Sequence, residues 1–295
     1  MKKGFRKMLA ERQQKLGSVL CVGLDPLPEK MPARFNKKNR RVSINVANWM
    51  IWVVDQTAEF ASMYKPQRAY WEAMIGGEEA LRKVIHHIHK NYPDIPVFLD
   101  CKRGDIDRTQ ARYRDAHFEI DEVDGMNFSP YMGEDTMSAL VNKEHMGRAL
   151  VGLCYTSNPK AREVQDVQLQ TRDIRGFTYW EFMAATILRW SQELGVTENA
   201  GLVMAAAYEN PKGSGKIYSK HLKRCREIVG DLLWFLIPGV GTQGGFVQQT
   251  IKDAFVGYGS IAINSSSGII FAENPGTEAK KLHEEMAEII LDMAA

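Results

Sequence analysis

The chain has 295 residues, of which 44% are hydrophobic and 25% are charged, and its formal net charge at pH 7 is +2. This balance excludes an intrinsically disordered chain, and because Lys and Arg are scattered rather than gathered in one block, we expect no binding to nucleic acid. One large α/β barrel needs about 250 residues, so we expect a single domain over residues 1–295.

Eight short apolar runs, each followed by a stretch long enough for a helix, recur along the chain. They occupy residues 19–25, 61–67, 97–102, 125–130, 149–157, 201–207, 234–240 and 260–265. Apolar residues recur at helical spacing in several stretches between and after them, namely 41–60, 108–120, 178–194, 219–229 and 277–293. Buried parallel strands read as continuous apolar runs, and eight alternations of strand and helix predict a (β/α)₈ TIM barrel.

The cysteines and the first residues bear on where the protein works. Four cysteines lie far apart without a CxxC pair, which predicts neither a zinc site nor a disulfide framework and favours the reducing cytoplasm. The basic first residues lack the apolar segment of a signal peptide, and no stretch approaches the roughly 20 apolar residues of a membrane span. We therefore expect a cytoplasmic protein that does not contact a membrane.

Polar residues close the apolar runs, where a barrel enzyme carries its reacting groups. The residues that end the first, second, third, fifth and seventh runs are Asp25, Lys65, Gln67, Asp100, Lys102, Asp105, Thr156, Ser157, Asn158, Pro238, Gly239 and Gln243. Three carboxylates and two ammonium groups are thus expected to converge on one small mouth. Charged side chains can be buried in an apolar barrel interior only when they are paired with opposite charges.

Asp100 and Lys102 are two residues apart, so a regular strand points both toward the barrel axis. An isolated D-x-K is more often an ordinary ion pair at a strand end. Here Lys65 and Asp25 on neighbouring strands favour a functional array instead. An ammonium group beside a carboxylate can stabilise a developing carbanion and then protonate it.

The segment DCKRGDIDRT, residues 100–109, resembles the D-x-K-x-x-D-I-x-x-T signature of the orotidine 5′-phosphate decarboxylases. Six further motifs resemble that family in the same order: VGLDP, YKPQRAYWE, NFSPYMGEDTM, YTSNP, LIPGVGTQGG and INSSSGIIFA. The TSNP and NSS segments are similar to the longer bacterial branch. The resemblance implies decarboxylation of orotidine 5′-monophosphate to uridine 5′-monophosphate, the last step of de novo pyrimidine nucleotide synthesis, without a cofactor or metal.

The resemblance also implies a role for each matching residue. Lys102 is expected to protonate C6 of the pyrimidine, Asp100 to face the departing carboxylate, and Lys65 to orient both. The residues expected to bind substrate are Asp25 at the ribose, Ser157 at the pyrimidine amide, Gln243 between base and phosphate, Ser267 at the phosphate end, and Pro238. Asp105 and Thr109 resemble a pair that crosses a dimer interface, which implies a homodimer.

Ser267 departs from the family pattern. The corresponding motif reads approximately N-S-S-R-G-I, and its arginine holds the substrate phosphate with a two-pronged fork that a serine hydroxyl cannot reproduce. We interpret Ser267 as an altered residue in an otherwise normal enzyme, with backbone N–H groups around 241–245 and 265–268 holding the phosphate. The alternative is drift toward another substrate or lower activity.

Two other functions are compatible with parts of the sequence. A related sugar-phosphate decarboxylase or lyase shares D-x-K-x-x-D but requires a metal, whereas YTSNP and PGVGTQGG favour a pyrimidine nucleotide as the substrate. A barrel that binds nucleotide with reduced activity is suggested only by Ser267.

Overall fold

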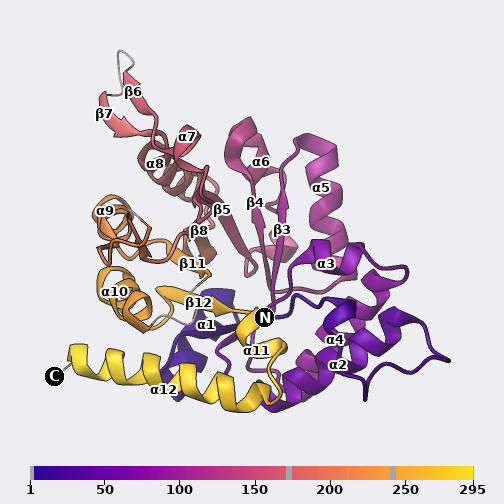
Figure 1. Cartoon of the computed structure of the whole chain (residues 1–295). Coiled ribbons are helices and arrows are strands. Elements are labelled where there is room, and N and C mark those ends of the chain that lie inside the picture. The colour runs from indigo at the N-terminus through magenta and orange to yellow at the C-terminus, as the bar shows by residue number, and fades with distance from the viewer. Residues whose placement is uncertain (1–2, 171–174, 211, 240–243, 295) are drawn as a thin grey trace.

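A barrel of eight parallel strands with helices around it forms the centre of the molecule (Figure 1). The computed structural model describes residues 3–170, 175–210, 212–239 and 244–294. The barrel strands are β1 (Leu20–Gly23), β2 (Met63–Lys65), β3 (Phe98–Arg103), β4 (Gly125–Phe128), β5 (Ala149–Tyr155), β8 (Ala200–Met204), β11 (Trp234–Pro238) and β12 (Ile261–Ser265). Each coincides with one of the eight predicted runs, so the predicted barrel is confirmed.

The strands run side by side in the order β2-β1-β12-β11-β8-β5-β4-β3. Two parallel bridges, Tyr64 to Val97 and Gln67 to Asp100, join the edge strands β2 and β3. The second bridge lies beside the predicted site, because Asp100 N–H donates to the carbonyl of Pro66 over 2.9 Å. Closure of the sheet therefore brings the end of β2 against the middle of β3.

Helices alternate with the strands. The longer ones are α2 (Val42–Thr57), α4 (Gly77–Asn91), α5 (Asp107–Asp115), α8 (Tyr179–Glu193), α9 (Lys220–Val229), α10 (Gly244–Ala254) and α12 (Pro275–Ala294). Short helices are α3 (Arg68–Glu72), α6 (Asp135–Ser138), α7 (Arg162–Gln165) and α11 (Ser267–Ile270), with a π-helical turn η2 (Ala116–Ile120) after α5 and a 3₁₀ turn η3 (Pro130–Met132) after β4. Among the described residues, no helix combines the length and apolarity needed to cross a bilayer.

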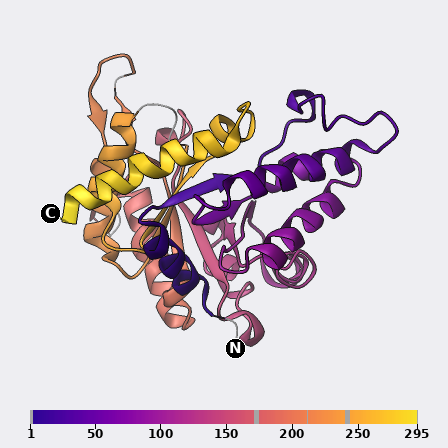
Figure 2. The same ribbon diagram turned by 90° about the horizontal axis from the view of Figure 1, so that it is seen from below.

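An additional helix, α1 (Phe5–Leu16), packs at the amino-terminal ends of the strands (Figure 2). The ring of Phe5 stacks on Trp234 at 5.2 Å and meets the edge of Phe98 at 6.0 Å, and these two residues begin β11 and β3. Leu9 belongs to the same buried cluster. Side chains thus fill this end of the barrel, which leaves the carboxyl ends of the strands for a site.

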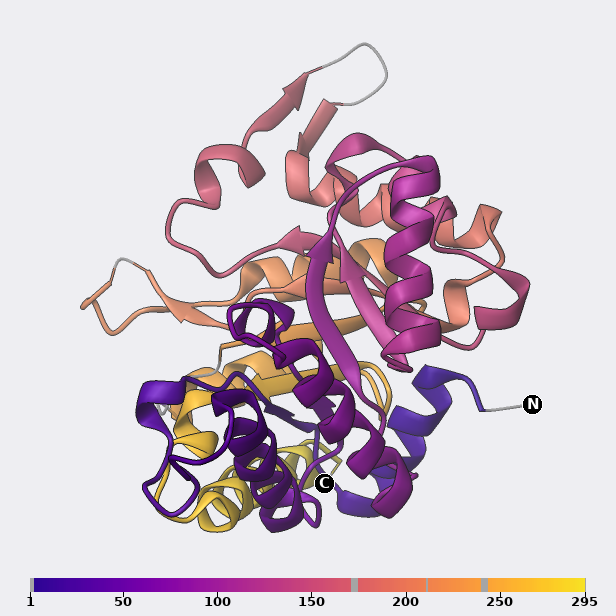
Figure 3. The same ribbon diagram turned by 90° about the vertical axis from the view of Figure 1, so that its right-hand side faces the viewer.

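Two antiparallel hairpins extend the loops on the carboxyl side. β6 (Gln168–Gln170) pairs with β7 (Arg175–Thr178) after β5, and β9 (Tyr208–Glu209) pairs with β10 (Ile217–Tyr218) after β8. Both project from the rest of the molecule (Figure 3). The sequence patterns did not predict these hairpins or α1.

Candidate active site

A cavity of about 530 Å³ opens at the carboxyl ends of the barrel strands. Its lining residues are Asp100, Lys102, Asn127, Ser129, Pro130, Tyr131, Leu153, Cys154, Thr156, Ser157, Asn158, Val164, Gln165, Tyr179, Val203, Leu236 and Pro238. Charged groups from β3 thus face an apolar surface from β5, β8 and β11. Such a cavity, apolar with a few convergent polar groups, is typical of a site for a small molecule.

Asp100 is the centre of the charged cluster. One carboxylate oxygen, Oδ1, accepts hydrogen bonds from Lys102 Nζ at 2.6 Å and Asn127 Nδ2 at 2.7 Å, and Oδ2 lies 3.3 Å from Lys65 Nζ. Lys65 and Asp100 are buried, whereas the Lys102 side chain is 45% exposed. Lys65, Asp100 and Lys102 therefore meet as predicted, and Lys102 is the most exposed of the three.

Mutual attraction keeps the buried pair charged. Burial raises the pKa of Asp100, but the positive charges of Lys65 and Lys102 outweigh it, and the net pKa lies below the usual value. Burial likewise lowers the pKa of Lys65, but the negative charges of Asp25 and Asp100 raise it further, and the net pKa is above the usual value. At neutral pH the site therefore holds a fixed ammonium and a fixed carboxylate.

The backbone of β3 is irregular at Lys102, and this corrects one step of the sequence argument. The pairing of β3 with β4 shifts register between Leu99 and Arg103, and Lys102 has φ 47°, in the left-handed region. A side chain at such an angle costs about 1–2 kcal/mol. Asp100 and Lys102 are in contact, but the strand between them is bulged, so the regular alternation that we assumed does not hold here.

Asn127 on β4 supports the bulge. Its side-chain oxygen accepts hydrogen bonds from the backbone N–H groups of Cys101 at 2.8 Å and Lys102 at 2.7 Å, while its amide nitrogen donates to Asp100. The side chain is buried. Asn127 was not among the predicted site residues, although it lies in the NFSP motif.

We expect Asn127→Ala to lower both stability and turnover. The change leaves two backbone donors without a partner, at about 1–3 kcal/mol each, and frees Asp100. The Tm of thermal unfolding should fall, and so should kcat. A folded variant with unchanged kcat would show that Asp100 and Lys102 do not need the hydrogen bonds of Asn127.

Asp25 follows β1 and lies at the edge of the array. Its Oδ1 accepts a hydrogen bond from the backbone N–H of Gln67 at 3.0 Å, next to the end of β2. Gly23 permits the close approach of β1 and the loop after β12, since a Cβ there would lie 2.5 Å from Cβ of Ser266. The carboxylate of Asp25 acts on Lys65 through its charge.

Ser157 and Pro238 line the cavity with Lys102, as predicted. Gln165, which the sequence argument did not identify, holds the loop that carries Ser157, because its side chain accepts from Thr156 N–H and donates to the Thr156 hydroxyl, both at 2.9 Å. Gln243 lies outside the described residues. Ser267 is exposed at the first position of α11 and is not among the residues that line the cavity.

Asp105 and Thr109 do not lie in this cavity. They line a separate hollow of about 800 Å³ between α5 and α6, with Ile106, Arg114 and Asp135 among its other residues. Within one chain they therefore line a different cavity from Lys102.

Both the sequence and the fold match a known protein family. The model of the Orotidine 5′-phosphate decarboxylase / HUMPS family matches residues 18–282. The chain belongs to this family. The family relatives include proteins from Cupriavidus necator and Ralstonia nicotianae, each named orotidine 5′-phosphate decarboxylase. They are 36% and 34% identical to this chain, and the matches cover 91% and 92% of it and 89% and 90% of the relatives.

Solved structures of family members have the same barrel. The structure of Leishmania donovani OMP decarboxylase matches with a TM-score of 0.77 and 29% identity, over 98% of this chain and 99% of that one. Membership of the Orotidine 5′-phosphate decarboxylase / HUMPS family thus rests on sequence and structure alike.

Proposed function

We propose that the chain decarboxylates orotidine 5′-monophosphate to uridine 5′-monophosphate, with Lys102 as the proton donor. The observation that carries this proposal is the ammonium group of Lys102, held 2.6 Å from the buried carboxylate of Asp100 at the wall of a cavity with an apolar side. The names of the curated relatives support the same reaction.

The chemistry follows from the charges. The bond between C6 and the carboxylate breaks, carbon dioxide leaves, and the electron pair stays on C6 as a vinylic carbanion that the ring cannot delocalise. A preorganised ammonium group stabilises this charge, and the proton then passes from Lys102 Nζ to C6. Asp100 and Lys65 hold the ammonium group in place, so that little reorganisation is needed as the charge develops.

A direct assay tests the reaction. Purified protein is incubated with orotidine 5′-monophosphate, with and without EDTA, and uridine 5′-monophosphate is measured by chromatography. We expect equal product in both samples. A requirement for metal would favour the sugar-phosphate lyase reading, and nucleotide binding without product would favour the non-catalytic one.

We expect Ser267→Arg to tighten substrate binding. Each charge-assisted hydrogen bond to the phosphate contributes about 1.5–3 kcal/mol, so KM should fall by roughly 10-fold or more while kcat changes little. Ser267→Gln, which adds length and polarity but no charge, is the matched control. An unchanged or lower kcat/KM for Ser267→Arg would contradict the idea that Ser267 weakens the phosphate site.

The proposed enzyme is a cytoplasmic homodimer, in which Asp105 and Thr109 complete the site of the partner subunit. Their position in a hollow away from Lys102 of the same chain supports this role. Ile106, Tyr131 and Met132 are large apolar residues that are exposed in the single chain, near the same strand ends. All four cysteines are free thiols, in keeping with a reducing compartment.

A further inference from the structure

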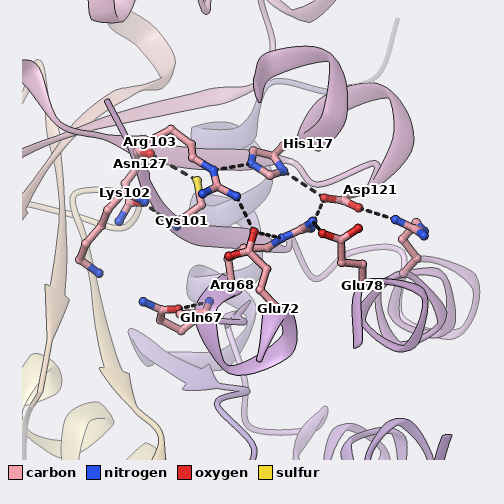
Figure 4. A network of polar contacts seen from close by, with 12 residues as sticks. Gln67, Arg68, Glu72, Glu78, Cys101, Lys102, Arg103, His117, Asp121 and Asn127 are labelled. Atoms are coloured by element: carbon pink, nitrogen blue, oxygen red, sulfur yellow. Dashed lines mark hydrogen bonds and ion pairs between the residues drawn. The ribbon is translucent and has the colours of Figure 1, made fainter. Parts of the chain in front are cut away.

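Five polar side chains form a closed ring of contacts next to Lys102 (Figure 4). The ring residues are Arg68, Glu72, Arg103, His117 and Asp121. Arg68 and Arg103 donate to the same oxygen of Glu72, at 3.0 and 2.7 Å. Arg103 Nε also donates to His117 Nε2 at 3.2 Å. His117 Nδ1 and Arg68 Nη1 then meet at one oxygen of Asp121, at 3.0 and 2.5 Å, which closes the ring.

The ring ties together the two segments that carry the catalytic lysines. Arg68 begins α3, three residues after Lys65, and Arg103 directly follows Lys102. Because Glu72 accepts from both arginines, it joins the end of β2 to the end of β3. Three ring members, Arg68, His117 and Asp121, are buried.

The charges of the ring balance when His117 is neutral. Because Arg103 donates to Nε2 of His117, the proton of the neutral imidazole is on Nδ1, and this N–H donates to Asp121. Burial lowers the pKa of His117 by more than the carboxylate of Asp121 raises it. The imidazole is therefore uncharged at neutral pH. The other groups that face the imidazole are the stacked ring of Tyr113 and, through its charge, Arg68. Two arginines and two carboxylates then cancel.

Arg103 is suited to its place because of its fork. One edge of the guanidinium serves Glu72 and His117, and its face lies 4.7 Å from the ring centre of Tyr113. A lysine ammonium has neither the rigid fork nor the flat face. The side chain of Arg103 is therefore held in three directions, and the backbone at its neighbour Lys102 is constrained with it.

We propose that Glu72 and Arg103 are positioning residues for the decarboxylation, and that the ring holds the left-handed backbone of Lys102 from its carboxyl side. Asn127 binds the N–H of Lys102 and supports the bulge from its amino side. The backbone of Lys102 is thus constrained from both its amino and its carboxyl side. Its ammonium group therefore stays beside Asp100 without reorganisation during the reaction. This inference rests on the proposed function.

The test compares two glutamates that bind the same arginine. Glu72 belongs to the ring, whereas Glu78 contacts Arg68 Nη2 at 2.9 Å from outside it. Because a misplacement of about 1 Å can cost up to 10²-fold in rate, we expect Glu72→Ala to lower kcat by roughly 30-fold with KM changed less than about 3-fold. Glu78→Ala should keep kcat within about 2-fold of the unmodified enzyme, since the ring stays closed.

Conservative variants separate positioning from folding. Glu72→Gln keeps an acceptor oxygen for both arginines and should recover most of the kcat lost in Glu72→Ala. Arg103→Lys keeps the charge but lacks the rigid planar fork that binds Glu72 and His117 along one edge, so it should lower kcat selectively even if Glu72→Ala does not fold. Circular dichroism and the Tm of each variant show whether it is folded.

The outcomes are distinct. The inference is overturned if a folded Glu72→Ala or Arg103→Lys variant has the kcat of the unmodified enzyme. It is also overturned if Glu72→Ala changes only KM, or if Glu78→Ala lowers kcat as much as Glu72→Ala does. If the unmodified protein itself releases no uridine 5′-monophosphate, the proposed function fails instead.

Discussion

Replacing Lys102 with alanine should nearly abolish decarboxylation. The change removes the proposed proton donor and the charge that stabilises the carbanion. General acid catalysis contributes about 10²–10⁴-fold and a preorganised electrostatic contact about 10²–10³-fold, so kcat should fall by at least roughly 10⁴-fold. Initial rates of uridine 5′-monophosphate formation, measured over long incubations, check the size of the loss.

The fold should survive this substitution, which makes the result interpretable. Alanine meets the same backbone cost as lysine at φ 47°, and Asp100 keeps hydrogen bonds from Lys65 and Asn127. The Lys102 side chain is partly exposed, so its removal opens no sealed cavity. Lys280→Ala, which removes an exposed lysine beside Glu284 on α12, is the control and should leave kcat unchanged. Retention of a tenth of the activity in Lys102→Ala would rule out Lys102 as the proton donor.

The barrel was predictable because parallel strands buried on both faces need continuous apolar side chains. β11, for example, reads WFLIP and its first four residues are buried, and β12 reads IAINS with all five buried. The helix α1 was not predictable from its own pattern, since it is polar over most of its length. Its place depends on Phe5 and Leu9, which contact strands far away in the sequence.

The charged cluster was predictable in membership but not in geometry. Strand ends must meet in a barrel, so Lys65, Asp100 and Lys102 were expected together. The left-handed backbone at Lys102 is supported by two hydrogen bonds that the N–H groups of Cys101 and Lys102 donate to the side-chain oxygen of Asn127, which is 25 residues further along the chain than Lys102. No local sequence pattern predicts this bulge, because the left-handed conformation of Lys102 is one that lysine disfavours.

The ring of contacts around Glu72 could not be predicted from the sequence either. Arg103 and Glu72 are 31 residues apart, and Arg68 and Asp121 are 53 apart. Charged residues usually lie at the surface, so the sequence gives no reason to pair these. Arg68 and Asp121 are nevertheless buried, because the ring satisfies their charges.

In the proposed homodimer, Asp105→Ala should also remove most of the activity, because Asp105 would then serve the site of the partner subunit. Loss of one charged group from a preorganised site costs about 10²–10³-fold in kcat, and we expect a loss of that size. Asp135→Ala is the matched control, because Asp135 lines the same hollow and is assigned no role in the reaction. An unchanged kcat in Asp105→Ala would show that the carboxylate does not serve either site.

Mixing the two inactive variants should restore activity. In a dimer of one Lys102→Ala chain and one Asp105→Ala chain, one site lacks both groups and the other has both intact. If chains exchange at random after refolding together, half of the dimers are mixed and each has one intact site, so the mixture should recover about a quarter of the unmodified activity. Recovery requires that Lys102 and Asp105 act from different chains, since two groups of the same chain could never be reunited. A mixture that contains mixed dimers but stays inactive would therefore place both groups in one subunit, and the hollow between α5 and α6 would need another explanation.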